Sequence, residues 1–253
     1  MSYPGSKGQA GVWQRIIGQM PPHPLYVEPF FGSGQVFWRK LISEMSIVID
    51  KNPACLVGVT RPGVVTICGD AIRWLQGAAE WEHLPDALIY CDPPYPLSTR
   101  KGRRYYKHEL TDLDHTTLLA SLQALKCRVM ISSPPCELYG AALRKWRCLE
   151  YDTMTRGGKR RECLWCNFPE PEQLHDWRFA GLNHRQRFGM KRFVRRWLAR
   201  IEAMPVRKRG YVLHELQVAI AQRQARRGGP LDIATPSLVL AAADAKAGDG
   251  GHQ

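Results

Sequence analysis

The chain has 253 residues, of which 44% are hydrophobic, so it is long enough for one α/β domain of ordinary size with an extension. Its 36 lysines and arginines outnumber 23 acidic residues and give a net charge of +13, which indicates a polyanionic partner. Nucleic acid is favoured over a membrane because no strongly amphipathic apolar anchor accompanies the charge. No signal peptide, transmembrane run or lipidation motif appears, and we therefore expect a cytoplasmic protein.

The amino-terminal third combines two glycine-containing loops with a short strand. Tyr3-Pro-Gly-Ser-Lys7 is a turn-rich loop that precedes a helix beginning near Ala10. The strand over 25–28 is followed by a glycine turn and, over 35–43, by a predicted helix. Glycines allow close approach of the backbone to a ligand, and the amino end of a helix offers free N–H groups. The pattern is not GxGxxG, so it indicates a nucleoside-type ligand and not a dinucleotide pyrophosphate.

Acidic side chains follow three successive predicted strands. Asp50 ends a strand over 46–50, Asp70 follows a strand over 64–68, and Asp92 follows an apolar strand over 87–90. In doubly wound folds the carboxyl ends of parallel strands meet at the edge where ligands bind, and an acid at the tip of the second strand takes ribose hydroxyls. These spacings predict a nucleoside site at that edge.

The segment Asp92-Pro93-Pro94-Tyr95 offers a carboxylate, carbonyl groups and a flat ring in one stiff turn. An exocyclic amino group on a base is a poor nucleophile because its lone pair is delocalised into the ring. Hydrogen bonds from that group to Asp92 and to the carbonyl of Pro93 would localise the lone pair, and Tyr95 would stack on the base. The alternative is an ordinary strand that ends in a Pro-Pro turn.

Two basic segments follow this turn. The first, over 97–109, interleaves cations with aromatic rings, as suits phosphates and exposed bases. The second is a Gly-Gly turn that joins strands predicted over 148–154 and 162–168. Either could instead be a solvated charged loop. The candidate nucleic-acid-binding residues of the two segments are Arg100, Lys101, Arg103, Arg104, Tyr105, Tyr106, Lys107, Arg156, Lys159, Arg160 and Arg161.

The remaining pattern predicts helices from Thr111/Asp112 and over 137–146, with a strand over 128–133 between them. The eight scattered cysteines fit free thiols in a reducing compartment. The one CxxC, Cys163 to Cys166, has no second pair and lies in a strand-like run, so we expect no metal site.

Residues 1 to about 168 resemble the Dam-type adenine-N6 DNA methyltransferases, a likeness that rests on four motifs in the right order. Tyr3 to Lys7 is similar to the family's amino-terminal cofactor motif, and Asp92 to Tyr95 to its catalytic tetrapeptide. Asp50 falls where the family holds the cofactor ribose, and Asp70 near the cofactor adenine. The family's glycine loop resembles Glu28-Pro29-Phe30-Phe31-Gly32-Ser33-Gly34.

The resemblance implies a Rossmann-like α/β fold of the S-adenosylmethionine-dependent methyltransferases, with a seven-stranded mixed sheet and helices on both faces. It also implies methyl transfer from S-adenosylmethionine to N6 of a flipped adenine in DNA, with Asp92, Pro93, Pro94 and Tyr95 as catalytic residues. An RNA adenine or a cytosine-N4 methyltransferase could use the same pocket. A non-catalytic nucleic-acid-binding protein with a relict fold is an alternative from a different class.

The chain departs from the family between the glycine loop and the tetrapeptide. Only 57 residues separate Gly34 from Asp92, and two strands and two crossovers already occupy them, so an inserted target-recognition domain has no room. We therefore predict short or relaxed sequence discrimination, and the family's usual GATC target is not carried over.

The carboxyl-terminal third is a basic extension, with 14 basic and 3 acidic residues between Leu174 and Gly229. A linker at 169–171 precedes predicted helices over 184–203 and 206–226, in which Arg192, Arg195 and Arg196 are candidate phosphate contacts. Phage-encoded members of the family often have a similar tail. The helices could instead dimerise, and we expect a monomer or weak dimer. The predicted divisions are 1–168, 169–228 and a disordered tail over 229–253.

Overall fold

The computed structural model describes residues 7–9, 11–100, 107–155 and 158–227. Several predicted site residues and the predicted disordered tail over 229–253 therefore lie outside the described residues, and their assignments stay predictions. The site residues concerned are Tyr3, Lys101, Arg103, Arg104, Tyr105, Tyr106 and Arg156.

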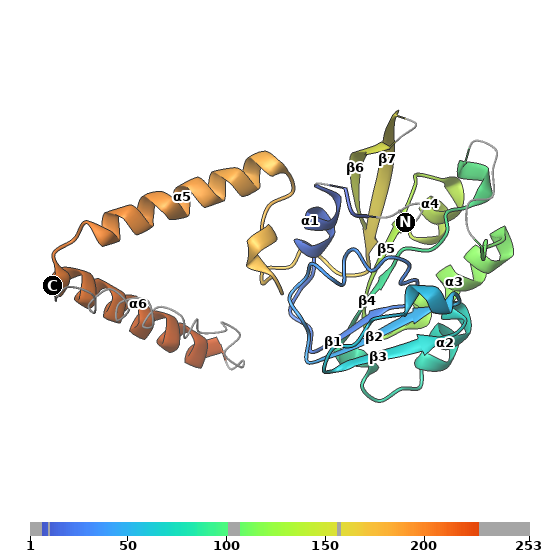
Figure 1. Ribbon diagram of the computed structural model, residues 1–253, viewed down its shortest axis with the longest axis horizontal. Helices are drawn as coiled ribbons and strands as arrows, with labels where there is room; N and C mark the ends of the chain where they lie inside the picture. Colours follow the sequence, from blue (N-terminus) through green and yellow to red (C-terminus); the bar gives the residue numbers. More distant parts are fainter. Residues whose placement is uncertain (1–6, 10, 101–106, 156–157, 228–253) are drawn as a thin grey trace, which may run out of the picture. The chain divides into compact units, whose positions relative to one another are not determined.

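The described chain is built on one seven-stranded mixed sheet in the order β3-β2-β1-β4-β5-β7-β6 (Figure 1). The first five strands run parallel, whereas β7 is antiparallel to both β5 and β6. The strands are β1 (Leu25–Glu28), β2 (Met45–Asp50), β3 (Val64–Cys68), β4 (Ala87–Cys91), β5 (Arg128–Ser133), β6 (Arg147–Thr155) and β7 (Gly158–Cys166). This confirms the predicted Rossmann-like α/β fold, with its seven-stranded mixed sheet.

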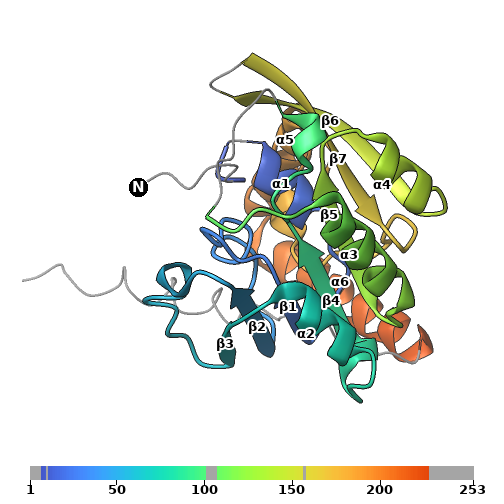
Figure 2. The same cartoon turned by 90° about the vertical axis from the view of Figure 1, so that its right-hand side faces the viewer.

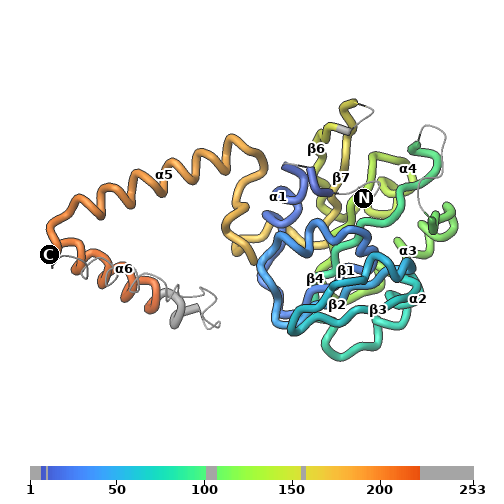
Figure 3. The backbone as a smooth tube through the Cα atoms, viewed as in Figure 1, coloured from blue at the N-terminus to red at the C-terminus, as the bar shows by residue number. Residues whose placement is uncertain are grey.

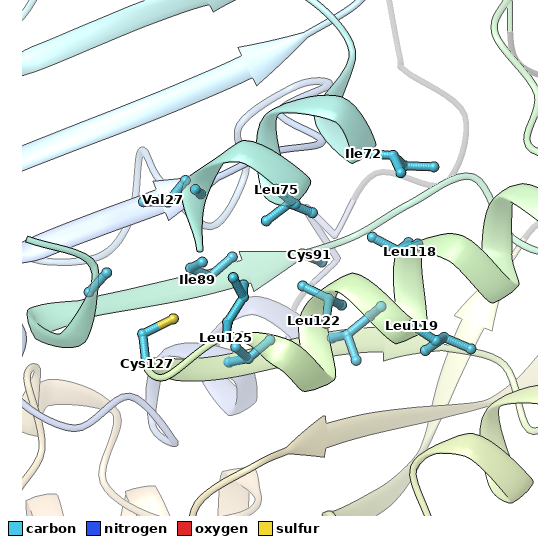
Figure 4. Close-up of a cluster of buried hydrophobic side chains, with 14 of the residues drawn as sticks. Val27, Ile72, Leu75, Ile89, Cys91, Leu118, Leu119, Leu122, Leu125 and Cys127 are labelled. Carbon is cyan, nitrogen blue, oxygen red and sulfur yellow. The ribbon is translucent and has the colours of Figure 1, made fainter. Parts of the chain in front are cut away.

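One face of the sheet is covered by α2 (Ala71–Ala78), α3 (Asp112–Ala124) and α4 (Glu137–Ala142). Alternate strand residues point to this face because successive side chains of a strand point to opposite sides. Ile89 and Cys91 of β4 meet Leu75 of α2 and Leu122 of α3, all of them buried (Figure 4). The helices α2 and α3 lie side by side over the middle of the sheet (Figure 2).

The opposite face is covered by α1 (Val12–Ile17) and by the segment that follows β1. Leu88 and Tyr90, the other half of the β4 alternation, pack here with Ile16 and Phe37. Because β4 is buried on both faces, its sequence is a continuous apolar run, as is typical of a central parallel strand.

Local sequence signals explain where α3 begins. The side chain of Thr111 accepts a hydrogen bond from the backbone N–H of Asp114, whose carboxylate accepts one from the N–H of Thr111. This reciprocal arrangement satisfies two N–H groups that have no partner within the helix.

The predicted helix over 35–43 is wrong. Residues 32–33 and 35–39 form turns, with hydrogen bonds such as Trp38 N–H to the carbonyl of Gly34, and no regular helix follows. Val36, Phe37 and Trp38 are β-branched or aromatic and favour helix weakly, and burial of Phe37 and Lys40 bends the segment onto the sheet. The glycine turn therefore does not open onto a regular helix.

Two other predicted bounds also differ. The helix predicted over 137–146 ends at Ala142. The strand predicted to begin at residue 162 begins at Gly158. Lys159, Arg160 and Arg161, which were predicted to lie in the Gly-Gly turn, are therefore part of β7. Strand alternation therefore sends neighbouring cations to opposite faces of the hairpin.

The chain divides into two compact units, residues 1–189 and 190–253. In the first unit, residues beyond the sheet still pack on it: Asp176 is fully buried, and the ring of Phe179 contacts that of Trp13. The helix α5 (His184–Glu202) begins at the end of the first unit and continues into the second, which also holds α6 (Val206–Arg227) (Figure 3). Among the described residues, no helix has the length and apolar character needed to cross a membrane.

Candidate active site

The tetrapeptide Asp92 to Tyr95 directly follows β4, at the centre of the sheet. Parallel pairing places the residues after β1, β2 and β4 at the same sheet edge, so the glycine loop and Asp50 share that edge with Asp92. Asp92 is mostly buried, with 19% of its side chain exposed, and Tyr95 is 6% exposed. The tetrapeptide is therefore part of the packed interior and is held in a fixed position.

Lys7 binds the carboxylate of Asp92. Its Nζ lies 2.7 Å from Oδ1, and the Lys7 side chain is only 7% exposed. Burial by itself lowers the pKa of Lys7, but the nearby carboxylates of Asp92 and Glu162 outweigh it and leave the pKa raised. Burial raises the pKa of Asp92, and the charge of Lys7 opposes that rise. The sequence placed Lys7 over the cofactor, whereas its closest described contacts are with Asp92 and Tyr95.

Glu162 of β7 is a member of this site that the sequence analysis missed. Its Oε2 accepts a hydrogen bond from the hydroxyl of Tyr95, and the same hydroxyl accepts one from Lys7. The Glu162 carboxylate also lies 3.7 Å from Lys7 Nζ. A signal was present, because Glu162 directly precedes the apolar run over 163–166, and a carboxylate buried beside such a run needs a partner.

The glycine loop is pinned by Asp50. The Oδ2 atom of Asp50 accepts a hydrogen bond of 2.7 Å from the N–H of Gly32, and Oδ1 accepts one of 2.8 Å from the N–H of Asn52. Gly32 and Gly34 have φ values of 52° and 59°, a region that L side chains rarely adopt. A Cβ at Gly34 would also lie 2.4 Å from the ring of Phe31. Both glycines are thus required by the turn itself.

The residues of the predicted loop motif differ in how deeply they are buried. Gly32 and Ser33 are half-buried, Pro29 and Phe31 are buried, and the half-buried Phe30 packs against the core on the α2–α3 face. Their assignment to a cofactor stays a prediction.

Glu28 is 3% exposed and accepts a hydrogen bond of 2.8 Å from the hydroxyl of Tyr26. Burial raises the pKa of Glu28 to about 8, although the Tyr26 hydrogen bond opposes the rise. Burial lowers the pKa of Lys40 to about 7, with Glu28 acting in the opposite direction. Glu28 is therefore a group of the protein interior with a pKa near neutrality, and its predicted contact with a cofactor stays a prediction.

Asp70 caps α2. Its Oδ1 accepts hydrogen bonds from the N–H groups of Ile72 and Arg73 at 2.8 and 3.0 Å, and its Oδ2 lies 2.6 Å from Nζ of Lys51. The predicted role of Asp70 near the cofactor adenine would have to coexist with this capping role.

The predicted nucleic-acid-binding cations divide into two groups. Arg100 is 6% exposed and is held by Glu109 at 2.8 Å and by the carbonyl of Tyr95, which does not support its predicted phosphate contact. Lys107 is exposed. In the second unit, Arg192, Arg195 and Arg196 are exposed along α5.

The hairpin cations point to both of its faces. Lys159 and Arg161 lie on one face, where they pair with Asp152 at 3.0 and 3.5 Å. Arg160 points to the other face, where its guanidinium lies over the Tyr95 ring, 4.9 Å from the ring centroid, and 3.6 Å from Oε1 of Glu162. Arg160 is therefore a residue of the candidate active site as well as of the hairpin.

Two buried polar atoms near this cluster have no hydrogen-bond partner within the described part of the chain: the hydroxyl of Tyr151 and Nη2 of Arg160. Tyr151 pairs with Glu162 across the β6–β7 register, which places both residues on the Tyr95 side. Buried polar groups normally have partners, so such atoms are suited to a polar ligand.

One group of described residues has metal-ligand types close together. The ligand atoms of Cys148, Glu150 and Cys163 lie within 4.8 Å of one another. Glu150 pairs with Arg161 at 3.4 Å, and burial raises the pKa of the Cys163 thiol to about 12, which disfavours the thiolate. The expected absence of a metal stays a prediction.

No family model matches this chain, and no curated protein matches it in sequence. Solved structures with a similar fold include a SAM-dependent methyltransferase from Agrobacterium tumefaciens (12% identity, TM-score 0.41, 62% of this chain and 60% of that one). The N-methyltransferase NodS from Bradyrhizobium japonicum has 12% identity and a TM-score of 0.39 over 63% of this chain and 93% of its own. SMU.1697c from Streptococcus mutans, solved with SAH, has 9% identity and a TM-score of 0.39, over 62% of this chain and 95% of its own. At this level the likeness carries no argument about substrate or residue roles.

Proposed function

We propose that this chain is an S-adenosylmethionine-dependent methyltransferase that methylates N6 of adenine in DNA. The observation that carries the proposal is the buried cluster at the end of the central strand. There, Asp92 and Tyr95 are linked through Lys7 at the edge that also presents the glycine loop and Asp50. A carboxylate and an aromatic ring fixed in this way suit an amino group on a flat base.

The residues of the sheet edge fit the proposed cofactor. Each oxygen of Asp50 accepts one described backbone hydrogen bond, and a carboxylate oxygen can accept more than one, so Asp50 can also accept from ribose hydroxyls. The turn from Phe31 to Gly34 lies at the same edge. Gly32 and Gly34 carry no side chain, so a ligand can approach the backbone there closely. When bound, S-adenosylmethionine supplies a sulfonium-activated methyl group.

The tetrapeptide orients the amino group of the target. Asp92 and the carbonyl of Pro93 accept hydrogen bonds from that group and direct its lone pair, and the ring of Tyr95 holds the base. Lys7 keeps the carboxylate in place through Oδ1 and favours its ionised form. Alignment of this kind accounts for much of the acceleration of a transfer from an already reactive donor.

The segment between the glycine loop and the tetrapeptide supports relaxed sequence discrimination. Between Gly34 and Asp92 the chain forms turns, β2, β3, α2 and β4, and no inserted domain. Phosphate contacts fall to Lys107, to the hairpin cations and to the exposed arginines of α5. Methylation sequencing that found one strict site of four or more bases would contradict this part of the proposal.

The test is transfer from labelled S-adenosylmethionine to duplex DNA, followed by digestion to nucleosides. We expect the label in N6-methyladenine. Label in N4-methylcytosine, or in RNA and not in DNA, would keep the proposed methyl transfer and change the proposed substrate. An absence of both transfer and S-adenosylmethionine binding would favour a relict fold that only binds nucleic acid.

A further inference from the structure

The hydroxyl of Tyr95 forms hydrogen bonds with two side chains that are far apart in the sequence, Lys7 and Glu162. It accepts a hydrogen bond from the Lys7 ammonium and donates its own proton to Glu162. A phenol has a single proton to donate, and burial raises the pKa of Tyr95, so the group stays protonated. Because each partner is charged, both hydrogen bonds belong to the stronger class.

Glu162 is placed for this contact by the strand it belongs to. Arg160 and Glu162 lie two residues apart on β7 and point to the Tyr95 side, whereas Lys159 and Arg161 point to the other side. The Glu162 side chain is 7% exposed, and its carboxylate contacts Lys7, Tyr95 and Arg160. By contrast, Lys159 and Arg161 are 66% and 59% exposed, and their pairs with acids belong to the surface.

These contacts fix the orientation of the Tyr95 ring. The backbone holds the Cα end of the residue, just after two prolines, and Glu162 holds the hydroxyl end. The Arg160 guanidinium lies over the ring between them. A ring held at both ends cannot tilt when a base stacks against it, and small tilts are costly where the reacting atoms must be aligned.

We propose that Glu162 is a positioning residue for the methyl transfer, and that it acts by anchoring the hydroxyl of Tyr95. The inference rests on the proposed function, because it assigns a role within that same site. It extends the functional residues from the tetrapeptide to β7, and it makes the hydroxyl of Tyr95, and not only its ring, necessary for full turnover.

A double-mutant cycle with Tyr95→Phe and Glu162→Met tests this role in the full chain. We expect Glu162→Met to lower kcat for DNA methylation about tenfold or more, the scale of one charged hydrogen bond, with S-adenosylmethionine and DNA affinities nearly unchanged. Glu162→Gln keeps an oxygen acceptor and should recover part of the loss. In the Tyr95→Phe background, Glu162→Met should cost less than about threefold, because contacting residues are not additive.

The matched control is Glu150→Gln, which removes a carboxylate from the neighbouring strand on the exposed face of the hairpin. It should keep the wild-type kcat. Normal turnover of Glu162→Met, or an equal loss in the wild-type and Tyr95→Phe backgrounds, would overturn the inference.

The two proposals can fail separately. If the wild-type chain methylates no nucleic acid, the proposed function fails. If the wild type is active and the cycle shows no coupling, only the role of Glu162 fails. The wild type, Tyr95→Phe, Glu162→Met and the double variant can also be compared by their free energies of unfolding in denaturant, a measurement that needs no activity. An absence of coupling between the two substitutions in these free energies would exclude the anchoring contact itself.

Discussion

Lys7 lies 85 residues before Asp92 in the chain, and its Nζ is 2.7 Å from Oδ1 of that carboxylate. The pair is largely buried from solvent, with the Lys7 and Asp92 side chains 7% and 19% exposed. Removal of one partner of a buried pair leaves the other charge unpaired, which is costlier than the loss of a surface pair. The amino-terminal segment and the tetrapeptide are therefore coupled in stability and in any chemistry that Asp92 performs.

Replacement of Asp92 tests that chemistry directly. We expect Asp92→Asn to lower turnover about 100-fold or more, the scale of losing one preorganised hydrogen bond in a transition state. DNA affinity should stay close to that of the wild type, since the proposed phosphate contacts are made by other residues. The exposed Asp86, just before β4, offers the control Asp86→Asn. Turnover of Asp92→Asn close to the control would exclude the proposed role.

Replacement of Lys7 should change the pH dependence of turnover. Burial raises the pKa of Asp92, and Lys7 holds that rise back. In Lys7→Met the pKa of Asp92 is higher still, and the active ionised form is lost as pH falls through that pKa. The acidic limb of the pH–rate profile should therefore move to higher pH. The profile of exposed Lys145→Met should match the wild type, and circular dichroism at each pH would confirm that Lys7→Met is folded.

The sequence predicted most of this fold because its signals are local. Strand alternation, apolar runs and the capping box at Thr111 depend on neighbours in the chain, and six of the seven strands lie within about two residues of their predicted bounds. The predicted helix over 35–43 failed because burial of Phe37 and Lys40 on the sheet outweighed a weak local preference.

The site was predictable only in part, for a related reason. Asp50 and Asp92 were found from strand ends, which the chain order reveals. Glu162 was missed because its partners, Tyr95 and Lys7, are 67 and 155 positions away, and only the antiparallel return of β7 brings them together. The side of the hairpin to which Arg160 points was not predictable either, because it depends on where β7 begins, and the sequence indicated a later start.

Asp50 should matter for cofactor affinity through the loop that it holds. Asp50→Ala removes acceptors for the N–H groups of Gly32 and Asn52, and with them the predicted contact with ribose. We expect the Kd for S-adenosylmethionine to rise about tenfold or more, as for loss of a hydrogen bond to a charged group. Calorimetric titration measures this, with Asp86→Ala as the control. An unchanged Kd would remove Asp50 from the cofactor site.

Glu28 should make stability depend on pH. Its pKa is raised by burial to about 8 in the folded chain, against an ordinary value near 4.5, so the folded state binds its proton more tightly than the unfolded state does. Stability from this group is present below the ordinary pKa and is lost as pH rises towards 8, by at most about 1.4 kcal/mol per pH unit. Glu28→Gln should flatten that part of the profile in denaturant unfolding. An identical slope in both proteins would contradict the assignment.

The arginines of α5 should contribute to DNA affinity and not to chemistry. Arg192, Arg195 and Arg196 are exposed and lie outside the unit that holds Asp92 and Tyr95. If each contacts a phosphate, the triple change to Gln should reduce the slope of log affinity against log salt by about 0.9 per contact and weaken binding across sequences alike. At saturating DNA, kcat should be preserved. The control is a triple change to Gln with the same change in net charge, made at three exposed residues of the first unit, Arg73, Lys126 and Arg144. Equal salt slopes in the two triple variants would mean that α5 contributes only through net charge.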